Sequence, residues 1–218
     1  ANVHIASYGV GLLTTDRVGA EGNDPGNYTQ LSGTSAAASV VTGVIALMLE
    51  ANPNLGYRDV QKILAYSASH PDAQDWKENA AQDHNLGGLR FNDQSGFGVV
   101  DAYAAVQLAR TWLASSTTLN EVSASARAFG LSTAIPDGDG DSYTINFEID
   151  SSMTVERLEL GVDLSHERLG DLVITLTSPN GTVSVLMDRP TVNAEQPFGL
   201  SGPDSGLPNH LLWDFSST

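Results

Sequence analysis

Ser32-Gly33-Thr34-Ser35 and the alanine-rich run behind it, residues 36–50, decide how the first half of the chain folds. The run contains no proline and ends at Asn52-Pro53, which is a stop signal for a helix. Its apolar residues fall on nearly all sides of a helix: Ala37, Val40, Val41, Val44, Ile45, Met48 and Leu49. This pattern is typical of a helix in the centre of a domain, so we expect residues 36–50 to form a buried helix.

Upstream of this helix the sequence indicates strands. Residues 3–8 alternate between apolar and polar side chains, and residues 11–15 form a second apolar and β-branched stretch. We predict a pair of strands around a glycine turn at Gly9. Residues 19–27 are rich in Gly, Asn, Asp and Pro, a composition typical of a surface loop.

Two further helices are predicted downstream. Residues 56–68 carry one apolar face, which indicates an amphipathic and peripheral helix: Tyr57, Val60, Ile63 and Leu64. Residues 69–94 are polar and predict a long loop. Residues 102–113 then predict a third helix, with Asp101 as its N-cap.

The character of the sequence changes at Ala114. Residues 114–127 are rich in Ser, Thr and Ala, the composition of a linker or of a first edge strand. Short β-type runs follow at residues 142–149, 154–164, 171–178, 183–187 and 211–215, and Asn180-Gly181 is set for a tight hairpin. Because helices and strands occur in separate blocks, we predict two domains, residues 1–113 and 114–218, the second a β-sandwich.

Composition excludes several classes of protein. With 41% hydrophobic and 17% charged residues, the 218-residue chain fits neither a disordered nor a collagen-like protein. Its 26 acidic and 10 basic residues give a net charge of -16, which argues against nucleic acid and favours cations or a basic substrate. No cysteine is present, so disulfides, a thiolate nucleophile and cysteine zinc sites are excluded.

Membrane and targeting segments are not evident in the sequence. The longest apolar run, residues 40–49, is shorter than the roughly 20 residues of a membrane-spanning helix. No signal peptide is visible, and the chain starts at Ala1 without a methionine. We interpret this start as a cut made upstream in a longer precursor.

Ser35 is the strongest candidate for chemistry. It follows Gly33-Thr34 at the entrance of an alanine-rich helix. There, free backbone N–H groups and the positive end of the helix dipole can stabilise a developing oxyanion. The alternative is that Ser35 simply caps the helix, which is a common use of serine.

The surrounding motifs favour the catalytic alternative. The helix segment resembles the nucleophile helix of subtilisin-like serine proteases, and most of all that of the kexin and furin branch. The resemblance rests on Gly33-Thr34-Ser35-Ala36-Ala37-Ala38, on residues 43–52, on Tyr57-Arg58-Asp59-Val60-Gln61, on Asp75-Trp76 and on Gly96-Phe97-Gly98-Val99-Val100-Asp101-Ala102. It implies the C-terminal part of an α/β subtilisin-like catalytic domain, with Ser35 as nucleophile and its backbone N–H as an oxyanion-hole donor.

The second block resembles the P domain, or homo B domain, that follows the catalytic domain in kexin-like proteases. The motifs are Ile135-Pro136-Asp137, residues 158–164, Arg168-Leu169-Gly170-Asp171-Leu172 and Leu176-Thr177-Ser178-Pro179-Asn180-Gly181-Thr182. This resemblance implies an all-β jelly-roll or sandwich that packs against the catalytic domain and stabilises it. Residues 210–215 resemble a late core strand, so the resemblance implies a domain that is incomplete at its C-terminus.

Three parts of the family's catalytic machinery are not found here. Members of the family carry the catalytic Asp, the His and the oxyanion-hole Asn well upstream of the nucleophile, whereas 34 residues precede Ser35. His4 lacks the Gly-Thr that follows the family's histidine, so we interpret it as a structural residue. Without a base the serine is a poor nucleophile, and this segment alone is expected to be inactive. Ser39 also departs from the family, most members of which carry a proline at this position.

Calcium is the cofactor that the sequence suggests. Asp137, Asp139 and Asp141 alternate with glycines and could supply hard oxygen ligands to Ca²⁺. The alternative is a solvated turn between strands, because the EF-hand pattern is not met. Asp171 is either a further ligand or a turn residue beside Arg168.

The remaining candidates fit structural roles. Core or domain-interface packing explains Trp76, Trp112 and Trp213 better than a carbohydrate platform does. The other histidines show no metal-ligand spacing, so we expect no zinc site: His70, His84, His166 and His210.

Three functional hypotheses follow from the sequence. The first is a secreted or cell-envelope endopeptidase that acts on protein or peptide substrates, some of them basic, with the remainder of the catalytic domain upstream and a propeptide or chaperone as partners. The second is an inactive fragment or pseudoprotease that binds partners through its β domain. The third treats the acidic β domain as a calcium-dependent module.

Overall fold

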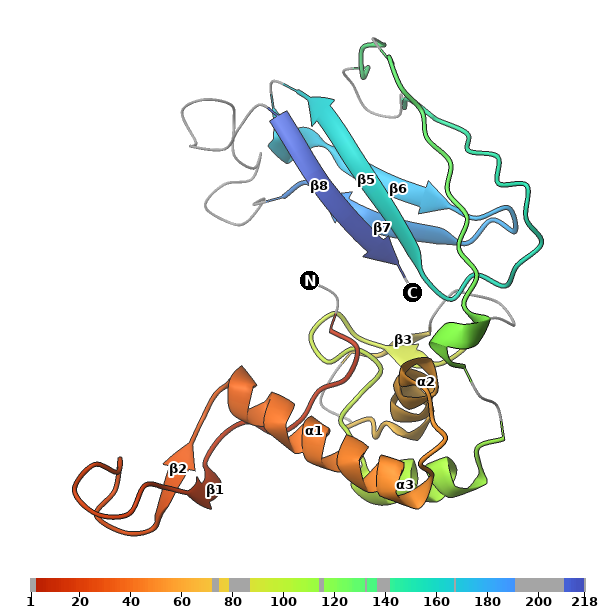
Figure 1. Ribbon diagram of the computed structural model, residues 1–218. Coiled ribbons are helices and arrows are strands. Elements are labelled where there is room, and N and C mark those ends of the chain that lie inside the picture. Colours follow the sequence, from red (N-terminus) through yellow and green to blue (C-terminus); the bar gives the residue numbers. More distant parts are fainter. Residues whose placement is uncertain are drawn as a thin grey trace.

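A computed structural model describes residues 3–71, 75–78, 87–113, 116–131, 133–136, 142–166, 168–190 and 210–217 of the chain (Figure 1). The first part contains α1 (Thr34–Ala51), α2 (Tyr57–Ser67), α3 (Ala102–Thr111), β1 (Leu12–Thr15), β2 (Tyr28–Leu31), β3 (Lys77–Glu78) and β4 (Arg90–Phe91). The second part contains β5 (Leu158–Ser165), β6 (Val173–Thr177), β7 (Val183–Asp188), β8 (His210–Ser217) and the short 3-10 helix η2 (Leu169–Asp171). A second such helix, η1 (Thr118–Asn120), lies between the two parts.

The core of the first part lies where α3 packs against α1 and α2. Met48 of α1 and Ile63 of α2 are fully buried there. Ala105 and Ala109 are also fully buried, and their spacing of four residues puts both on one face of α3. Small side chains on this face let the helix axes approach closely. The three predicted helices are thus confirmed to within two residues at each end, and Asp101 caps α3 by accepting from the Ala104 N–H at 2.9 Å.

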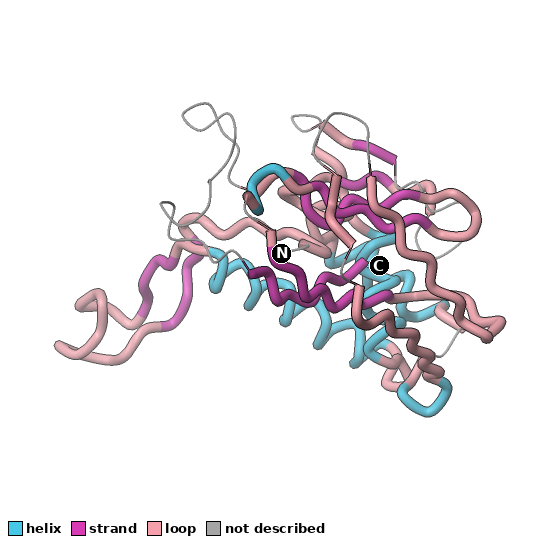
Figure 2. The backbone as a smooth tube through the Cα atoms, turned by 90° about the horizontal axis from the view of Figure 1, so that it is seen from above, coloured by secondary structure: helices cyan, strands magenta, loops and turns pink. Residues whose placement is uncertain are grey.

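The predicted pairing of residues 3–8 with residues 11–15 is wrong. The backbone of Ala6 accepts from Val100 N–H at 2.9 Å and donates to Gly98 O at 2.8 Å, so the first segment lies along residues 96–100. β1 instead pairs antiparallel with β2, with Leu12 opposite Leu31, and this hairpin carries the predicted loop over residues 19–27 at its tip. The hairpin projects from the start of α1 in both backbone views (Figures 1 and 2).

The expectation that the first helix is buried on nearly all sides is also wrong. Val44 and Met48 are buried against the core, but Val40, Leu47 and Leu49 are 37%, 49% and 39% exposed. The reason is that α3 covers one face of α1 and the opposite face is open among the described residues. By length and composition α1 is long and apolar enough to span a membrane, with a mean hydropathy of 1.6 over its 18 residues. The shorter apolar run at residues 40–49 did not indicate this. A core helix of a folded domain has the same composition, and α1 packs on α3 as such a helix does.

The second part consists of two antiparallel strand pairs. β5 pairs with β8 and β6 pairs with β7, and the first pair lies across the second (Figure 1). Along β5 half-buried and exposed side chains alternate strictly, which is the pattern of a strand with one face toward a core. This two-layered arrangement agrees with the predicted β domain. The strand predicted at residues 142–149 is absent, because no described strand pairs with this extended segment.

The predicted hairpin at Asn180-Gly181 is present with a different turn. Gly181 N–H donates to Ser178 O, and Ser178 N–H donates to Thr182 O, both at 2.9 Å. Pro179 and Asn180 therefore occupy the centre of the turn, and Gly181 follows with a φ of 84°. This is a three-residue loop closed by a left-handed glycine, rather than a two-residue Asn-Gly turn.

Candidate active site at the start of helix α1

Ser35 is the second residue of α1 and does not cap it. The N-cap is Gly33, whose φ of 140° favours glycine, and α1 has no side-chain cap. The interpretation of Ser35 as a helix cap is therefore wrong. The Ser35 side chain is exposed. The β1–β2 hairpin departs from the same end of α1 (Figure 1).

The backbone N–H of Ser35 is available to a ligand. A capping side chain accepts from the second or third N–H of a helix, which here are those of Ser35 and Ala36. Because Gly33 has no side chain, neither N–H is taken up in this way. No acceptor for the Ser35 N–H occurs among the residues that the structure describes. The helix dipole adds partial positive charge at the same place.

Two glycines before β1 hold the start of α1 in place. Gly33 N–H donates to Gly9 O at 2.7 Å, and Gly11 N–H donates to the Ser32 side chain Oγ at 2.9 Å. A Cβ at Gly9 would lie 2.8 Å from Gly33 O, so this close approach requires glycine. We call Gly9, Gly11, Ser32 and Gly33 the glycine clip.

One turn further along α1, the side chain of Ser39 bonds the backbone carbonyl of Ser35. Ser39 Oγ donates to Ser35 O at 3.2 Å. A proline at this position, as in most of the resembling proteases, has neither this hydroxyl nor an N–H. The departure at Ser39 therefore adds a donor to the Ser35 carbonyl.

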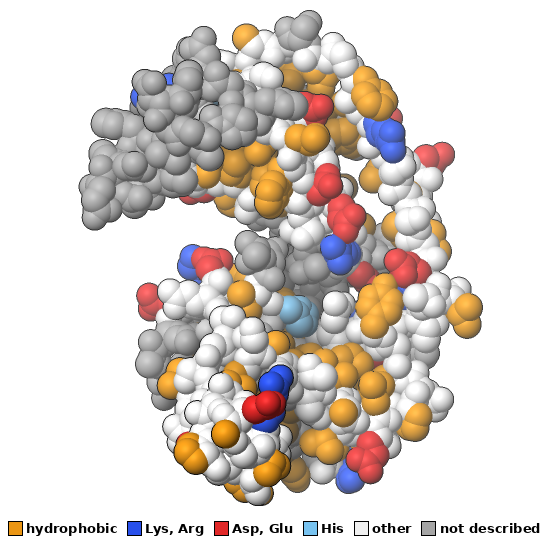
Figure 3. Space-filling model, turned by 60° about the vertical axis from the view of Figure 1, so that its left-hand side comes forward, with side chains coloured by type: hydrophobic (Ala, Val, Ile, Leu, Met, Phe, Trp, Pro, Cys, Tyr) orange, Lys and Arg blue, Asp and Glu red, His pale blue; other side chains and the backbone are white. Residues whose placement is uncertain are grey.

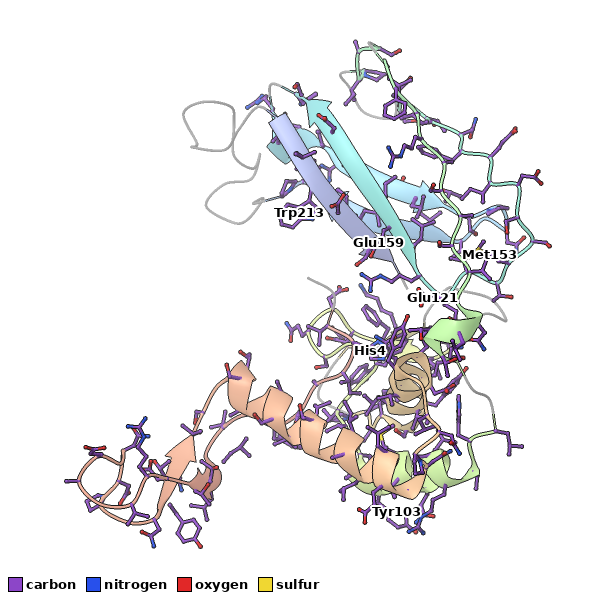
Figure 4. The ribbon with its side chains drawn as sticks, in the orientation of Figure 1. His4, Tyr103, Glu121, Met153, Glu159 and Trp213 are labelled. Carbon is purple, nitrogen blue, oxygen red and sulfur yellow. The ribbon has the colours of Figure 1, made fainter. Side chains whose placement is uncertain are left out.

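His4, His70 and His166 make contacts away from Ser35. His4 lies beside α2, where its Nε2 is 2.9 Å from Gln61 O and its ring meets Phe97 edge-on at 5.3 Å (Figure 4). His70 packs edge-on against Trp76, and His166 Nδ1 bonds the backbone of Arg168. The interpretation of His4 as a structural residue agrees with these contacts. His84 lies outside the described residues.

The calcium candidates Asp137, Asp139 and Asp141 all lie outside the described residues. Within the described part of the chain, no group of three His, Cys, Asp or Glu side chains is placed to hold a metal ion. Asp171 pairs with Arg168, Oδ2 to Nε, at 3.5 Å, which fits the alternative of a turn residue.

The tryptophans divide between packing and exposure. Trp112 packs against the core of the first part, and its Nε1 donates to Asp59 at 2.9 Å, which fits the predicted core or domain-interface packing. Trp76 is half-buried, and its Nε1 donates to Pro71 O at 3.0 Å. Trp213 lies opposite Val162 in the β5–β8 pair but is 60% exposed, so the packing role predicted for it is not found among the described residues.

The start of α2 is a junction that the sequence did not predict. The carboxylate of Asp59 is fully buried and accepts from Ser116 N–H at 2.8 Å, from Trp112 Nε1 at 2.9 Å and from Gly56 N–H at 3.1 Å. Burial acts to raise the pKa of Asp59, but these hydrogen bonds outweigh it and hold the pKa below its usual value. The only sequence signal was the acidic residue in the first turn of a predicted helix.

Salt bridges join the same turn of α2 to the second part. Arg58 and Lys62 both pair with the carboxylate of Glu156, just before β5. Burial acts to raise the pKa of Glu156, but the two cations outweigh it and the pKa lies below its usual value. Arg58 also bonds Thr117 O, and Tyr57 O–H donates to Glu121 at 3.0 Å, which raises the pKa of Tyr57. Figure 4 labels Glu121 at this junction.

Two protein families match the two parts of the chain. The model of the subtilase family matches residues 1–98, and that of the proprotein convertase P-domain matches residues 155–199. The first part of the chain matches the subtilase family. The chain's predicted resemblance to kexin-like subtilases and its predicted fold class are confirmed. The predicted domain boundary after residue 113 falls between the two matches and stays a prediction.

Matches to individual relatives extend over most of this chain. Proprotein convertase subtilisin/kexin type 5 of Rattus norvegicus is 33% identical over 193 residues, and the match covers 83% of this chain. The Aeromonas extracellular serine protease of Aeromonas sobria is 31% identical over 173 residues and 72% of this chain. Crystal structures of an Aeromonas sobria serine protease, alone and in complex with a chaperone, align with 88% of this chain at TM-scores of 0.56 and 0.55 and identities of 25% and 24%.

This chain spans only part of each relative. It covers 10% of the rat convertase, 28% of the Aeromonas extracellular protease and 35% of the chain in the crystal structures.

Proposed function

We propose that this chain carries the nucleophile of a serine endopeptidase, which hydrolyses peptide bonds through an acyl intermediate on Ser35. The observation that carries the proposal is the open start of α1. There an exposed hydroxyl stands beside a backbone N–H that has no acceptor among the described residues. The match of residues 1–98 to the subtilase family supports the same chemistry.

The reaction needs groups beyond this chain. Ser35 Oγ attacks the substrate carbonyl carbon, and its proton passes to a histidine that is oriented by an aspartate. The Ser35 N–H donates to the oxyanion that forms. The amine leaves with that proton, and water then hydrolyses the ester. In this proposal the catalytic Asp, His and Asn come from sequence upstream of this chain.

The open face of α1 supports a further catalytic-domain portion as its partner. Val40, Leu47 and Leu49 present apolar surface there, and hydrophobic side chains are visible over the lower part of the molecule (Figure 3). Surface of this kind favours burial by other parts of a protein. The small share of each relative that this chain covers is consistent with such a partner.

Substrate, chaperone and location are parts of the same proposal. The net charge of -16 favours substrates with basic residues. A chaperone or propeptide fits as a partner, since one Aeromonas sobria protease structure contains a chaperone. A secreted or cell-envelope location is supported by the extracellular Aeromonas relative. Calcium at Asp137, Asp139 and Asp141 stays a prediction.

The test is hydrolysis of a quenched-fluorescent peptide library by the full-length gene product that carries this chain. Ser35→Ala should lower the rate on the order of 10⁶-fold, because the nucleophile acts as a unit with its base. Thr111→Ala is a matched control, since its exposed hydroxyl bonds Leu108 O at 3.2 Å at the end of α3. We expect no change from this control. Hydrolysis that Ser35→Ala leaves unchanged would refute the proposal. A folded wild type that hydrolyses none of the peptides would also refute it and would favour the inactive binding module.

A further inference from the structure

We propose that Ser32 is a positioning residue for Ser35, a role that rests on the proposed function above. Ser32 lies three residues before Ser35, and its hydroxyl takes part in the glycine clip. It does not touch the reacting atoms in this proposal. Its effect is transmitted through the backbone of Gly33 and Thr34.

The start of α1 lacks the support that a helix usually has. Serine, threonine, asparagine or aspartate at the N-cap normally fixes the first turn by accepting from its N–H groups. Gly33 cannot do this, and the advantage is that the Ser35 N–H stays free for an oxyanion. The first turn must then be held from outside the helix.

The glycine clip supplies that external support. The ladder between β1 and β2 ends at Leu12 opposite Leu31, and Gly11 turns away with a φ of 65°. The Ser32 side chain extends the pairing by one position, because its Oγ accepts from Gly11 N–H at 2.9 Å. Gly33 N–H to Gly9 O, at 2.7 Å, is the second bond. Both hydrogen bonds fix the direction in which the chain passes from β2 into α1, and therefore the position of Ser35.

Ser32 is the only side chain among these contacts, which makes it the point where the clip can be tested. Gly9, Gly11 and Gly33 contribute backbone atoms alone. Ser32 is exposed and lies outside the cluster around Met48 and Ile63, so its loss should leave the core intact. Misplacement of a reacting group by about 1 Å can cost roughly 100-fold in rate.

The experiment measures kcat, KM and the melting temperature of the full-length gene product with Ser32→Ala, Ser32→Thr and the control Thr111→Ala. We expect Ser32→Ala to lower kcat roughly 10- to 100-fold while KM and the melting temperature stay unchanged. Ser32→Thr keeps the hydroxyl and should restore kcat to near the wild-type value.

Different failures have different meanings. An active wild type with unchanged kcat in Ser32→Ala overturns the positioning role and leaves the proposed function standing. The positioning role is likewise overturned if Ser32→Thr fails to restore kcat. It is also overturned if Ser32→Ala lowers the melting temperature and this loss of stability accounts for the lower kcat. A wild type that neither hydrolyses peptides nor depends on Ser35 overturns the proposed function, and the role of Ser32 with it.

Discussion

Helices α1 and α2 both begin after a glycine, yet their first turns are occupied in opposite ways. At α1 the N-cap Gly33 leaves the N–H of Ser35 without an acceptor among the described residues. At α2 the buried carboxylate of Asp59 accepts from Gly56 N–H and ties the turn to Ser116. The comparison teaches that one helix start leaves its N–H groups without an acceptor among the described residues, whereas the other is closed by the protein's own groups.

The start of α2 also connects the two parts of the chain. Four residues of the first two turns of α2 bond the segment after α3 or the second part of the chain: Tyr57, Arg58, Asp59 and Lys62. Bonds of this kind orient the β domain on the helices. Among the described residues, the open start at α1 is held by the glycine clip.

The largest expected effect comes from closing the start of α1. Gly33→Asp introduces a side chain that can accept from the Ser35 or Ala36 N–H, so it competes with the oxyanion. We expect kcat of the full-length gene product to fall roughly 10²- to 10³-fold, as when one oxyanion donor is removed.

Gly33→Ala is the matched control for this substitution. Alanine suffers the same backbone strain at a φ of 140° but offers no acceptor. Its kcat should therefore lie well above that of Gly33→Asp. Equal losses in the two variants would show that strain, and not occupation of the N–H groups, explains the effect.

Removing the Asp59 carboxylate at the start of α2 should lower the free energy of unfolding rather than the rate of catalysis. Asp59→Ala leaves Ser116 N–H, Gly56 N–H and Trp112 Nε1 without their acceptor, and we expect the free energy of unfolding to fall by about 3 kcal/mol. Urea unfolding measures this value. Asp101→Ala, which removes the cap of α3, should cost only about 1 kcal/mol. A smaller loss for Asp59→Ala than for Asp101→Ala would contradict the closed junction.

The smallest effect concerns Glu156. Glu156→Gln removes the shared partner of Arg58 and Lys62, and we expect a loss of about 1 kcal/mol at neutral pH. Because the pKa of Glu156 is lowered on folding, its contribution is present above the unfolded value near 4.5 and is lost as the pH falls through the folded value. The difference from wild type should therefore vanish in acid.

Glu159→Gln provides the comparison for that pH series. Glu159 pairs with Arg157 at 2.7 Å, but both side chains are mostly exposed, so no measurable change is expected. Urea unfolding between neutral pH and pH 3 tests both variants. A Glu156→Gln deficit that grows as the pH falls would refute the predicted sign.

The sequence predicted those features that depend on local signals. The three helices were predicted because their caps, stop signals and apolar spacing lie within one stretch of chain, as at Asp101 and Asn52-Pro53. Four of the five predicted β runs correspond to β5, β6, β7 and β8. Ser35 could be identified as a candidate because Gly33-Thr34 precedes it and an alanine-rich helix follows it.

Features that depend on distant residues could not be predicted. The partner of residues 3–8 lies about ninety residues away, and the register of a strand is not encoded within the strand itself. The junction brings Asp59 together with Trp112 and Ser116, which no spacing rule connects. The exposure of Val40 and Leu47 depends on what covers α1, which its own periodicity does not state.

The central claim is that Ser35 is a nucleophile whose base lies upstream of this chain. Peptide mapping by mass spectrometry after fluorophosphonate treatment tests it most directly, on the full-length gene product and on this chain alone. We predict an adduct on Ser35 in the full-length product and none in the isolated chain, because the serine needs its base. Folded full-length protein without an adduct on Ser35 would contradict the claim.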